Sequence, residues 1–175
     1  MRPESIVAAL LLALGAVAAA QDQPPLTHGL TAVEPYPAPE LVLENMDDDA
    51  VGLVSLRGNV VVINFWATWC PPCRREMPSL ERMHQEIGER GVGVLAVNVG
   101  EDFETVFGFL GAVDPSPTFP VLFDRDGAAL ERWGVRGLPT TFIVDPAGRV
   151  VARAVGGREF DHPELMQRLS ALAAR

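Results

Sequence analysis

Residues 60–78 read VVVINFWATWCPPCRREMP. The first seven are almost all β-branched or aromatic, which is typical of a central strand buried on both faces. A helical pattern then runs to about Arg90, with apolar residues recurring on one side: Met77, Leu80, Met83 and Ile87. The stretch therefore predicts a buried strand followed at once by a helix, with the pair Cys70 and Cys73 at the junction.

These two cysteines are the only ones in the chain. Three positions apart, they close too short a loop to restrain the unfolded chain, so a purely structural disulfide explains them poorly. At a helix N-terminus, free N–H groups and the helix dipole stabilise an anion, which predicts a lowered pKa for Cys70. Pro71 and Pro72 suit a first helical turn. We expect Cys70 to attack a partner's disulfide and Cys73 to resolve the mixed disulfide.

Metal chemistry competes with this interpretation. Four-coordinate zinc needs two ligands besides the cysteines, and the three histidines, His28, His84 and His162, are scattered along the chain. The acidic triplet 47–49 is interpreted as a solvated turn rather than a calcium site, because it lacks spaced oxygen ligands. We predict no metal site and no cofactor other than the cysteine pair. A redox-silent copper-binding module remains an alternative.

Downstream of the cysteines, strand and helix patterns alternate. The expected elements are a strand at 93–99, a helix at 101–110, a strand at 119–123, a short helix through Trp133, a hairpin of 141–144 and 149–155, and a last helix from Asp161. The last helix carries Pro163 and Glu164 in a capping-box arrangement. Strands alternating with helices, followed by a hairpin, predict a three-layer α/β sandwich around a mixed sheet.

The N-terminus carries signs of export. Arg2 precedes an apolar run at 6–20, which ends in small residues and is shorter than the roughly 20 residues of a spanning helix. We therefore expect a cleaved signal peptide at 1–20, a proline-rich lead at 21–38 and a folded domain at 39–175. A retained inner-membrane anchor through residues 6–20 is the alternative. The net charge of −9 argues against nucleic acid as a partner.

Two separated motifs resemble a known family. Residues 64–78 and residues 134–142, GVRGLPTTF, are similar to the active-site segments of membrane-associated thioredoxin-like proteins of the TlpA/ResA type. The resemblance implies a thioredoxin-like fold facing the periplasm, with an N-terminal extension. It also implies an inserted strand–helix stretch at about 98–114.

The resemblance also implies roles for particular residues. Pro139 matches the cis-proline that faces the cysteines, and Leu138 would bind a client peptide through its backbone. Glu76 matches an acid that influences proton transfer, although a surface glutamate favoured by the helix dipole is the alternative. Asn64 replaces a buried aspartate of ordinary thioredoxin and cannot accept a proton as a base. The remaining residues expected along the client groove are Trp69, Pro71 and Pro72.

The function implied is that of a periplasmic thiol:disulfide oxidoreductase. We expect it to keep client cysteine pairs reduced, either in cytochrome c maturation or in assembly of the copper site of a respiratory oxidase, with electrons from a membrane thiol donor. A disulfide oxidase or isomerase and a thiol peroxidase are the alternatives within the same chemistry. Three acids of the inserted stretch are expected on the surface: Glu101, Asp102 and Glu104.

Overall fold

The computed structural model describes residues 27–175, so the predicted signal peptide at 1–20 lies outside the described residues. A six-stranded sheet has the order β1-β8-β7-β4-β5-β6. Its strands are β1 (Thr31–Pro37), β4 (Val60–Trp66), β5 (Val92–Val99), β6 (Val121–Asp124), β7 (Thr140–Val144) and β8 (Arg149–Val155). A small second sheet pairs β2 (Val42–Glu44) with β3 (Ala50–Gly52). The helices are α1 (Pro71–Ile87), α2 (Phe103–Leu110), α3 (Ala128–Arg132) and α4 (Pro163–Ala173), with 3-10 segments at Leu53–Leu56 and Gly88–Arg90.

Strand β4 lies in the middle of the sheet, and all seven of its residues are buried. It pairs parallel with β5 and antiparallel with β7, so the sheet is mixed as predicted. Successive side chains of a strand point to opposite faces. Val60, Val62 and Trp66 therefore join one apolar cluster, and Val61, Ile63 and Phe65 join the other.

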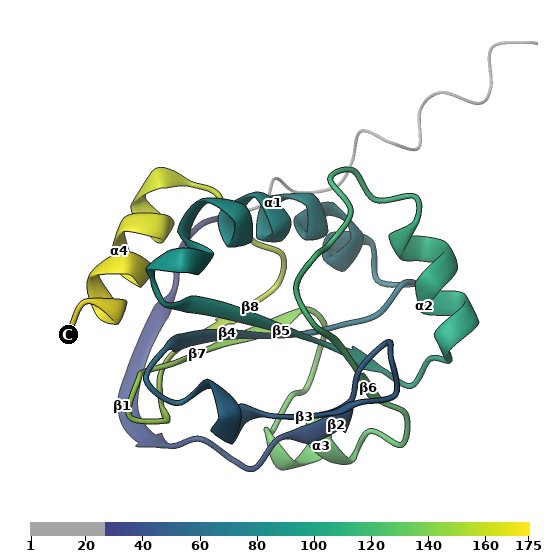
Figure 1. The fold of residues 1–175 in the computed structure, drawn as a ribbon, viewed down its shortest axis with the longest axis horizontal. Coiled ribbons are helices and arrows are strands. Elements are labelled where there is room, and N and C mark those ends of the chain that lie inside the picture. The colour runs from purple at the N-terminus through teal and green to yellow at the C-terminus, as the bar shows by residue number, and fades with distance from the viewer. Residues whose placement is uncertain (1–26) are drawn as a thin grey trace, which may run out of the picture.

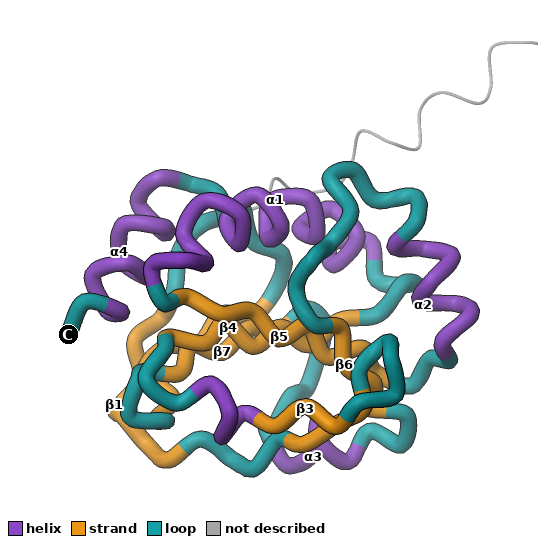
Figure 2. Tube along the Cα trace, in the orientation of Figure 1, coloured by secondary structure: helices purple, strands orange, loops and turns teal. Residues whose placement is uncertain are grey.

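The two clusters define the layers of the molecule. Helices α1 and α4 cover one face of the sheet, and α3 with the β2–β3 hairpin covers the other, while α2 lies beyond the β6 edge (Figures 1 and 2). Val106 and Leu110 of α2 belong to the same cluster as α1 and α4. The predicted three-layer α/β sandwich is confirmed.

The N-terminal boundary of the sheet differs from the prediction. Residues 31–37, within the stretch expected to be a lead, form β1 and pair antiparallel with β8. The register shifts between Ala32 and Tyr36, around Pro35. Proline lacks the N–H donor of a strand ladder and is tolerated at sheet edges and bulges, so a proline-rich sequence can still form this edge strand.

Two helix starts also differ from the prediction. Helix α4 begins at Pro163 with His162 as its N-cap. Asp161 does not cap it but forms a salt bridge with Arg82, with Arg82 Nε 2.6 Å from Asp161 Oδ2. Helix α2 begins at Phe103, and Asp102 caps it by accepting the N–H of Thr105. Within residues 27–175, no helix combines the length and apolarity that crossing a membrane requires.

Candidate active site

The cysteine pair lies where the central strand ends and α1 begins. After Trp66 the chain makes a turn, closed by the Cys70 N–H donating to the carbonyl of Ala67 at 3.2 Å. Cys70 is the N-cap of α1, and its Sγ accepts the N–H of Cys73 at 3.4 Å. The two cysteines form a disulfide. The helix N-terminus thus points a backbone donor at the first sulfur, as the sequence predicted.

The two sulfurs differ little in exposure. Cys70 is 2% exposed and Cys73 is 0% exposed, so the predicted order holds but the difference is small. The adjacent Trp69 is 68% exposed, and Pro71 is also exposed, whereas Pro72 is half-buried. These three side chains surround the pair with apolar surface that a client could contact.

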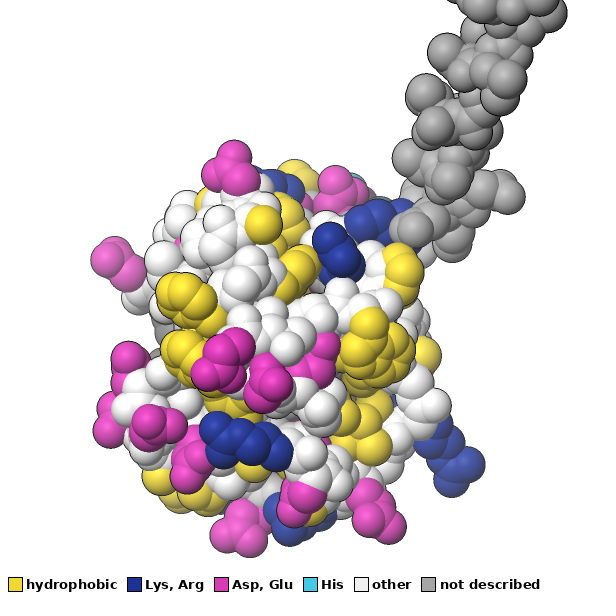
Figure 3. Space-filling model, turned by 90° about the vertical axis from the view of Figure 1, so that its right-hand side faces the viewer, with side chains coloured by type: hydrophobic (Ala, Val, Ile, Leu, Met, Phe, Trp, Pro, Cys, Tyr) yellow, Lys and Arg dark blue, Asp and Glu magenta, His cyan; other side chains and the backbone are white. Residues whose placement is uncertain are grey.

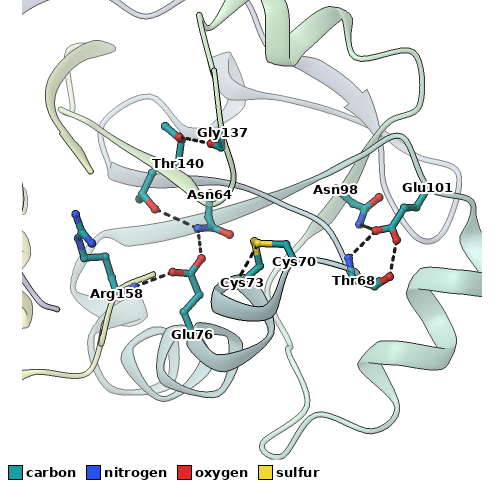
Figure 4. The surroundings of a disulfide bond; sticks show 11 residues. Asn64, Thr68, Cys70, Cys73, Glu76, Asn98, Glu101, Gly137, Thr140 and Arg158 are labelled. Atoms are coloured by element: carbon teal, nitrogen blue, oxygen red, sulfur yellow. Dashed lines mark hydrogen bonds between the residues drawn. A yellow bond between two sulfur atoms is a disulfide. The ribbon is translucent and has the colours of Figure 1, made fainter. Parts of the chain in front are cut away.

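The second predicted motif lies at the same end of the sheet. Thr140, the first residue of β7, pairs with Phe65 near the end of β4. The residue before it, Pro139, therefore lies level with the start of the turn that leads to Cys70. The Leu138–Pro139 bond is cis, which confirms that prediction. In Figure 4, Gly137 and Thr140, on either side of this bond, lie above Asn64 near the disulfide.

Glu76 is fully buried, so the alternative that placed it on the surface is wrong. Its Oε1 accepts from Asn64 Nδ2 at 2.8 Å, and its Oε2 accepts from the backbone N–H of Arg158 at 2.8 Å (Figure 4). Burial removes water from the carboxylate and raises the pKa of Glu76 to about 8, against the opposing effects of Asn64 and Arg158. Both protonation states are therefore accessible near neutral pH.

Asn64 serves the site as a hydrogen-bond donor. The alternation along β4 turns its side chain toward α1, and its Nδ2 also contacts Thr141 Oγ1 at 3.1 Å. Its Oδ1 is buried without a hydrogen-bond partner. An amide that donates to Glu76 cannot take a proton from a thiol, so Glu76 is the titratable group at this position.

Sequence reasoning missed Arg158 because it acts on Glu76 through its backbone, which no side-chain pattern reveals. Its guanidinium donates to four carbonyls, those of Gly29, Val155, Gly156 and Gly157. These bonds hold the loop after β8 against the N-terminal segment. The burial of Glu76 did have a signal, because Glu76 precedes Leu80 by four residues and lies within the apolar stripe of the helix.

Glu101 also departs from the prediction. It is half-buried rather than on the surface, and its carboxylate accepts hydrogen bonds from Thr68 and Asn98. Asp102 and Glu104 are exposed, as expected. Figure 3 views the face that carries α2 and shows acidic side chains interspersed with apolar patches.

The histidines are less scattered than the sequence suggested. The rings of His28 and His162 stack with centroids 3.6 Å apart, and His28 Nε2 lies 3.3 Å from an oxygen of Glu164. The rings are parallel within 5°, so their in-plane lone pairs do not converge on one point. Ring stacking and the contact between His28 and Glu164 account for this cluster without a metal.

Comparison with known proteins gives a consistent result. The AhpC/TSA family profile matches residues 36–153. ResA of Bacillus subtilis, named a thiol-disulfide oxidoreductase, is 39% identical over 119 residues, which cover 68% of this chain and 65% of that protein. ResA of Halalkalibacterium halodurans is 38% identical over 120 residues, which cover 69% of this chain and 67% of that protein. The chain thus spans about two thirds of the length of these relatives.

A solved structure agrees with the sequence relatives. A Chlorobium tepidum protein described as a putative thiol:disulfide interchange protein DsbE superposes with a TM-score of 0.73 and 33% identity, covering 82% of this chain and 99% of that one. The predicted thioredoxin-like fold and the resemblance to ResA are confirmed. The chain belongs to the AhpC/TSA family and is similar, within it, to the ResA thiol-disulfide oxidoreductases.

Proposed function

We propose that this protein is a thiol:disulfide oxidoreductase that reduces cysteine pairs of client proteins. One observation carries the proposal: a cysteine pair at the N-terminus of α1 lies one helical turn from a fully buried carboxyl group, Glu76. Residues three apart on a helix are neighbours on its surface. The cysteines supply the electrons, and Glu76 supplies a site for the proton that must move with them.

The reaction proceeds in two exchanges. The Cys70 thiolate attacks one sulfur of the client disulfide, forming a mixed disulfide and releasing the client's other sulfur as a thiolate. Cys73 then loses its proton and attacks Cys70 Sγ, which releases the first client sulfur. The client gains two electrons as two thiols, and Cys70 and Cys73 are oxidised to the disulfide.

Glu76 is suited to the second exchange. General acid–base catalysis is most efficient when the pKa of the catalytic group lies near the working pH. A pKa of about 8 for Glu76 lies in the range where thiols ordinarily titrate, so its carboxylate can accept the proton that Cys73 loses. In the oxidised protein the same group can hold the proton until electrons return.

The surroundings of the pair favour the reducing direction. Strong oxidants of this fold stabilise their reduced form as a thiolate. Here both cysteines are buried and an ionisable carboxyl lies nearby, and each of these features opposes the stabilisation that the helix N-terminus gives to a Cys70 thiolate. The guanidinium of Arg74, the residue after Cys73, packs over the ring of Phe109 in α2, 5.3 Å from the centroid. This cation is therefore engaged with an aromatic ring.

We place this activity outside the cytoplasm, where disulfides form and clients need reduction. The sequence of residues 1–20 supports export, either with cleavage or with retention as an anchor. The similarity to ResA supports clients with cysteine pairs, such as apocytochromes c or the copper-site subunits of a respiratory oxidase. A membrane thiol donor would return the electrons.

The test is reduction of a disulfide-bonded peptide by the prereduced protein, followed by measurement of the reduction potential. We expect stoichiometric reduction, its loss in Cys70→Ser, and a potential nearer to that of thioredoxin, about −270 mV, than to that of DsbA, about −120 mV. A potential close to −120 mV would show that the protein is an oxidase. Peroxide consumption that depends on Cys70 would instead indicate a peroxidase.

A further inference from the structure

A second carboxylate lies beside the cysteine loop, on the opposite side from Glu76 in Figure 4. Oε2 of Glu101 accepts from the backbone N–H of Thr68 at 2.7 Å and from Asn98 Nδ2 at 2.7 Å. Its Oε1 accepts from the hydroxyl of Thr68. Three donors thus converge on one half-buried carboxylate.

These bonds hold the turn that leads from β4 to the cysteine pair. Thr68 is the second residue of the turn closed between Ala67 and Cys70. The turn directs Trp69 into solvent, where it is 68% exposed. It also sets Cys70 as the N-cap of α1, with its sulfur facing the Cys73 N–H. A group that anchors Thr68 therefore determines where the attacking sulfur lies.

Glu101 reaches Thr68 because of how β4 and β5 end. Trp66 pairs with Asn98 in the parallel ladder, so both strands end at the same level of the sheet. Gly100 has a φ of 74°, a conformation that favours glycine. It lies between Asn98 and Glu101, whose side chains then meet in the hydrogen bond described above.

We propose that Glu101 is a positioning residue for thiol–disulfide exchange. It fixes the turn at 67–70, and thereby keeps Cys70 within reach of the α1 N-terminus and Trp69 turned toward the client. This inference rests on the proposed function for its catalytic consequence, but its effect on the Cys70 thiol does not depend on any client.

Glu101 can influence the pKa of Cys70 in two ways, and these shift it in opposite directions. As a bare negative charge it would raise the pKa of Cys70, and its removal would lower that pKa. As an anchor it keeps the thiolate beside the helix N-terminus, and its removal would raise the pKa. The variant Glu101→Ala distinguishes them, because it removes the charge and all three hydrogen bonds together, and the sign of the resulting shift in the pKa of Cys70 shows which effect is larger.

The experiment measures the alkylation rate of Cys70 against pH in the Cys73→Ser background, where Cys70 is the only thiol. We expect Glu101→Ala to raise the pKa of Cys70 by about half a unit or more, the size expected for lost helix-terminus stabilisation. The matched control is Glu104→Ala, which removes the same charge from an exposed side chain three residues away. It should leave the pKa unchanged. Both variants retain the charged residues that follow the pair on α1: Arg74, Arg75 and Glu76.

A pKa that stays constant or falls in Glu101→Ala would overturn the proposal. If that variant does not fold, Thr68→Val removes one of the three donors and keeps the backbone N–H. We expect it to shift the pKa upward by a smaller amount, and an unchanged pKa would overturn the proposal equally.

Turnover separates this inference from the proposed function. With the native cysteines, Glu101→Ala should lower kcat/KM for disulfide reduction about tenfold or more, since it removes at least one charge-assisted hydrogen bond from the turn. If the wild-type protein reduces no disulfide, the proposed function fails, but the shift in the Cys70 pKa still decides the role of Glu101.

Discussion

Glu76 combines full burial with two hydrogen-bond donors and a position one turn from Cys73. Burial disfavours its charged form, whereas Asn64 and the N–H of Arg158 favour it. Because burial has the larger effect, the group titrates in the range where thiols also titrate. A chemical role at this position therefore has measurable consequences for both rate and stability.

The first prediction concerns rate. Glu76→Gln keeps the side-chain volume but removes the ionisable group, so the exchange that depends on Cys73 should slow by about tenfold or more. The pH dependence of the rate should lose its inflection near 8. Stopped-flow kinetics of peptide disulfide reduction measure both. Glu159→Gln is the control, because Glu159 is exposed on the same loop as Arg158. An unchanged pH profile in Glu76→Gln would remove Glu76 from the mechanism.

The second prediction concerns stability. The pKa of Glu76 is about 8 in the folded protein and 4.5 as its ordinary value. Between these values the folded state holds a proton that the unfolded state has lost, so the free energy of unfolding falls as pH rises, by up to about 1.4 kcal/mol per pH unit. Below the lower value the stabilisation is complete, and above the upper one it is gone.

Denaturant unfolding of the oxidised protein at about pH 5 and about pH 9 measures this effect, with Glu76→Gln as the reference. The free energy of unfolding of the wild type, relative to that of the variant, should decrease as the pH rises from about 5 to about 9. A constant difference would mean that Glu76 is charged throughout.

At the scale of elements, β1 connects the N-terminal segment to the active site. It covers the edge of β8, and the segment before it accepts hydrogen bonds from Arg158 and Glu159 through Gly29 and Thr27. Arg158 in turn donates its N–H to Glu76. The stretch predicted to be a lead thus supports the loop that holds the buried carboxyl.

A shortened chain tests this support. A protein starting at Pro39 should unfold at a temperature lower by about 5 °C or more than one starting at Thr27, because it loses the β1–β8 pairing. It should also self-associate, since an unpaired strand edge offers hydrogen bonds to other chains. Calorimetry and light scattering measure the two effects. Equal melting temperatures would show that β1 adds nothing to the stability of the domain.

At the scale of the whole molecule, the strand ends, the start of α1 and the Gly137–Thr140 loop meet at one end of the sheet (Figure 4). Trp69 projects from this end into solvent. We expect a client that reaches Cys70 to contact Trp69 as well. The proposed division of roles between the two cysteines can be tested with clients present.

Cys73→Ser should accumulate a mixed disulfide through Cys70, because the resolving thiol is missing. Cys70→Ser should accumulate little, since Cys73 lies within α1 whereas Cys70 caps its N-terminus. Extracts of the exported fraction, separated without reductant and analysed by mass spectrometry, would identify the adducts and their clients. Adducts formed mainly by Cys70→Ser would reverse the assignment of the two roles.

The sequence by itself determined the central strand, the helix after it and the cysteine pair between them. An apolar β-branched run is typical of a strand in the interior of a sheet, and Pro71 and Pro72 suit a first helical turn, where their missing N–H groups cost nothing. The local sequence also determined the hairpin turn at 145–148, because Gly148 adopts a φ of 79°, a conformation that favours glycine. The cis bond at Pro139 came from family resemblance rather than from local physics.

The tertiary structure decided how deeply each acid is buried and what it contacts. Glu76 and Glu101 both stand at the start of predicted helices, and the sequence signalled only that Glu76 lies within an apolar stripe. The fold buries Glu76 fully and brings Glu101 to the N–H of Thr68. Their burial depends on the packing of α1 on β4 and on the parallel register of β4 with β5. Such contacts join residues far apart in the chain, and the free energy of burying a carboxyl depends on partners that only the fold brings together.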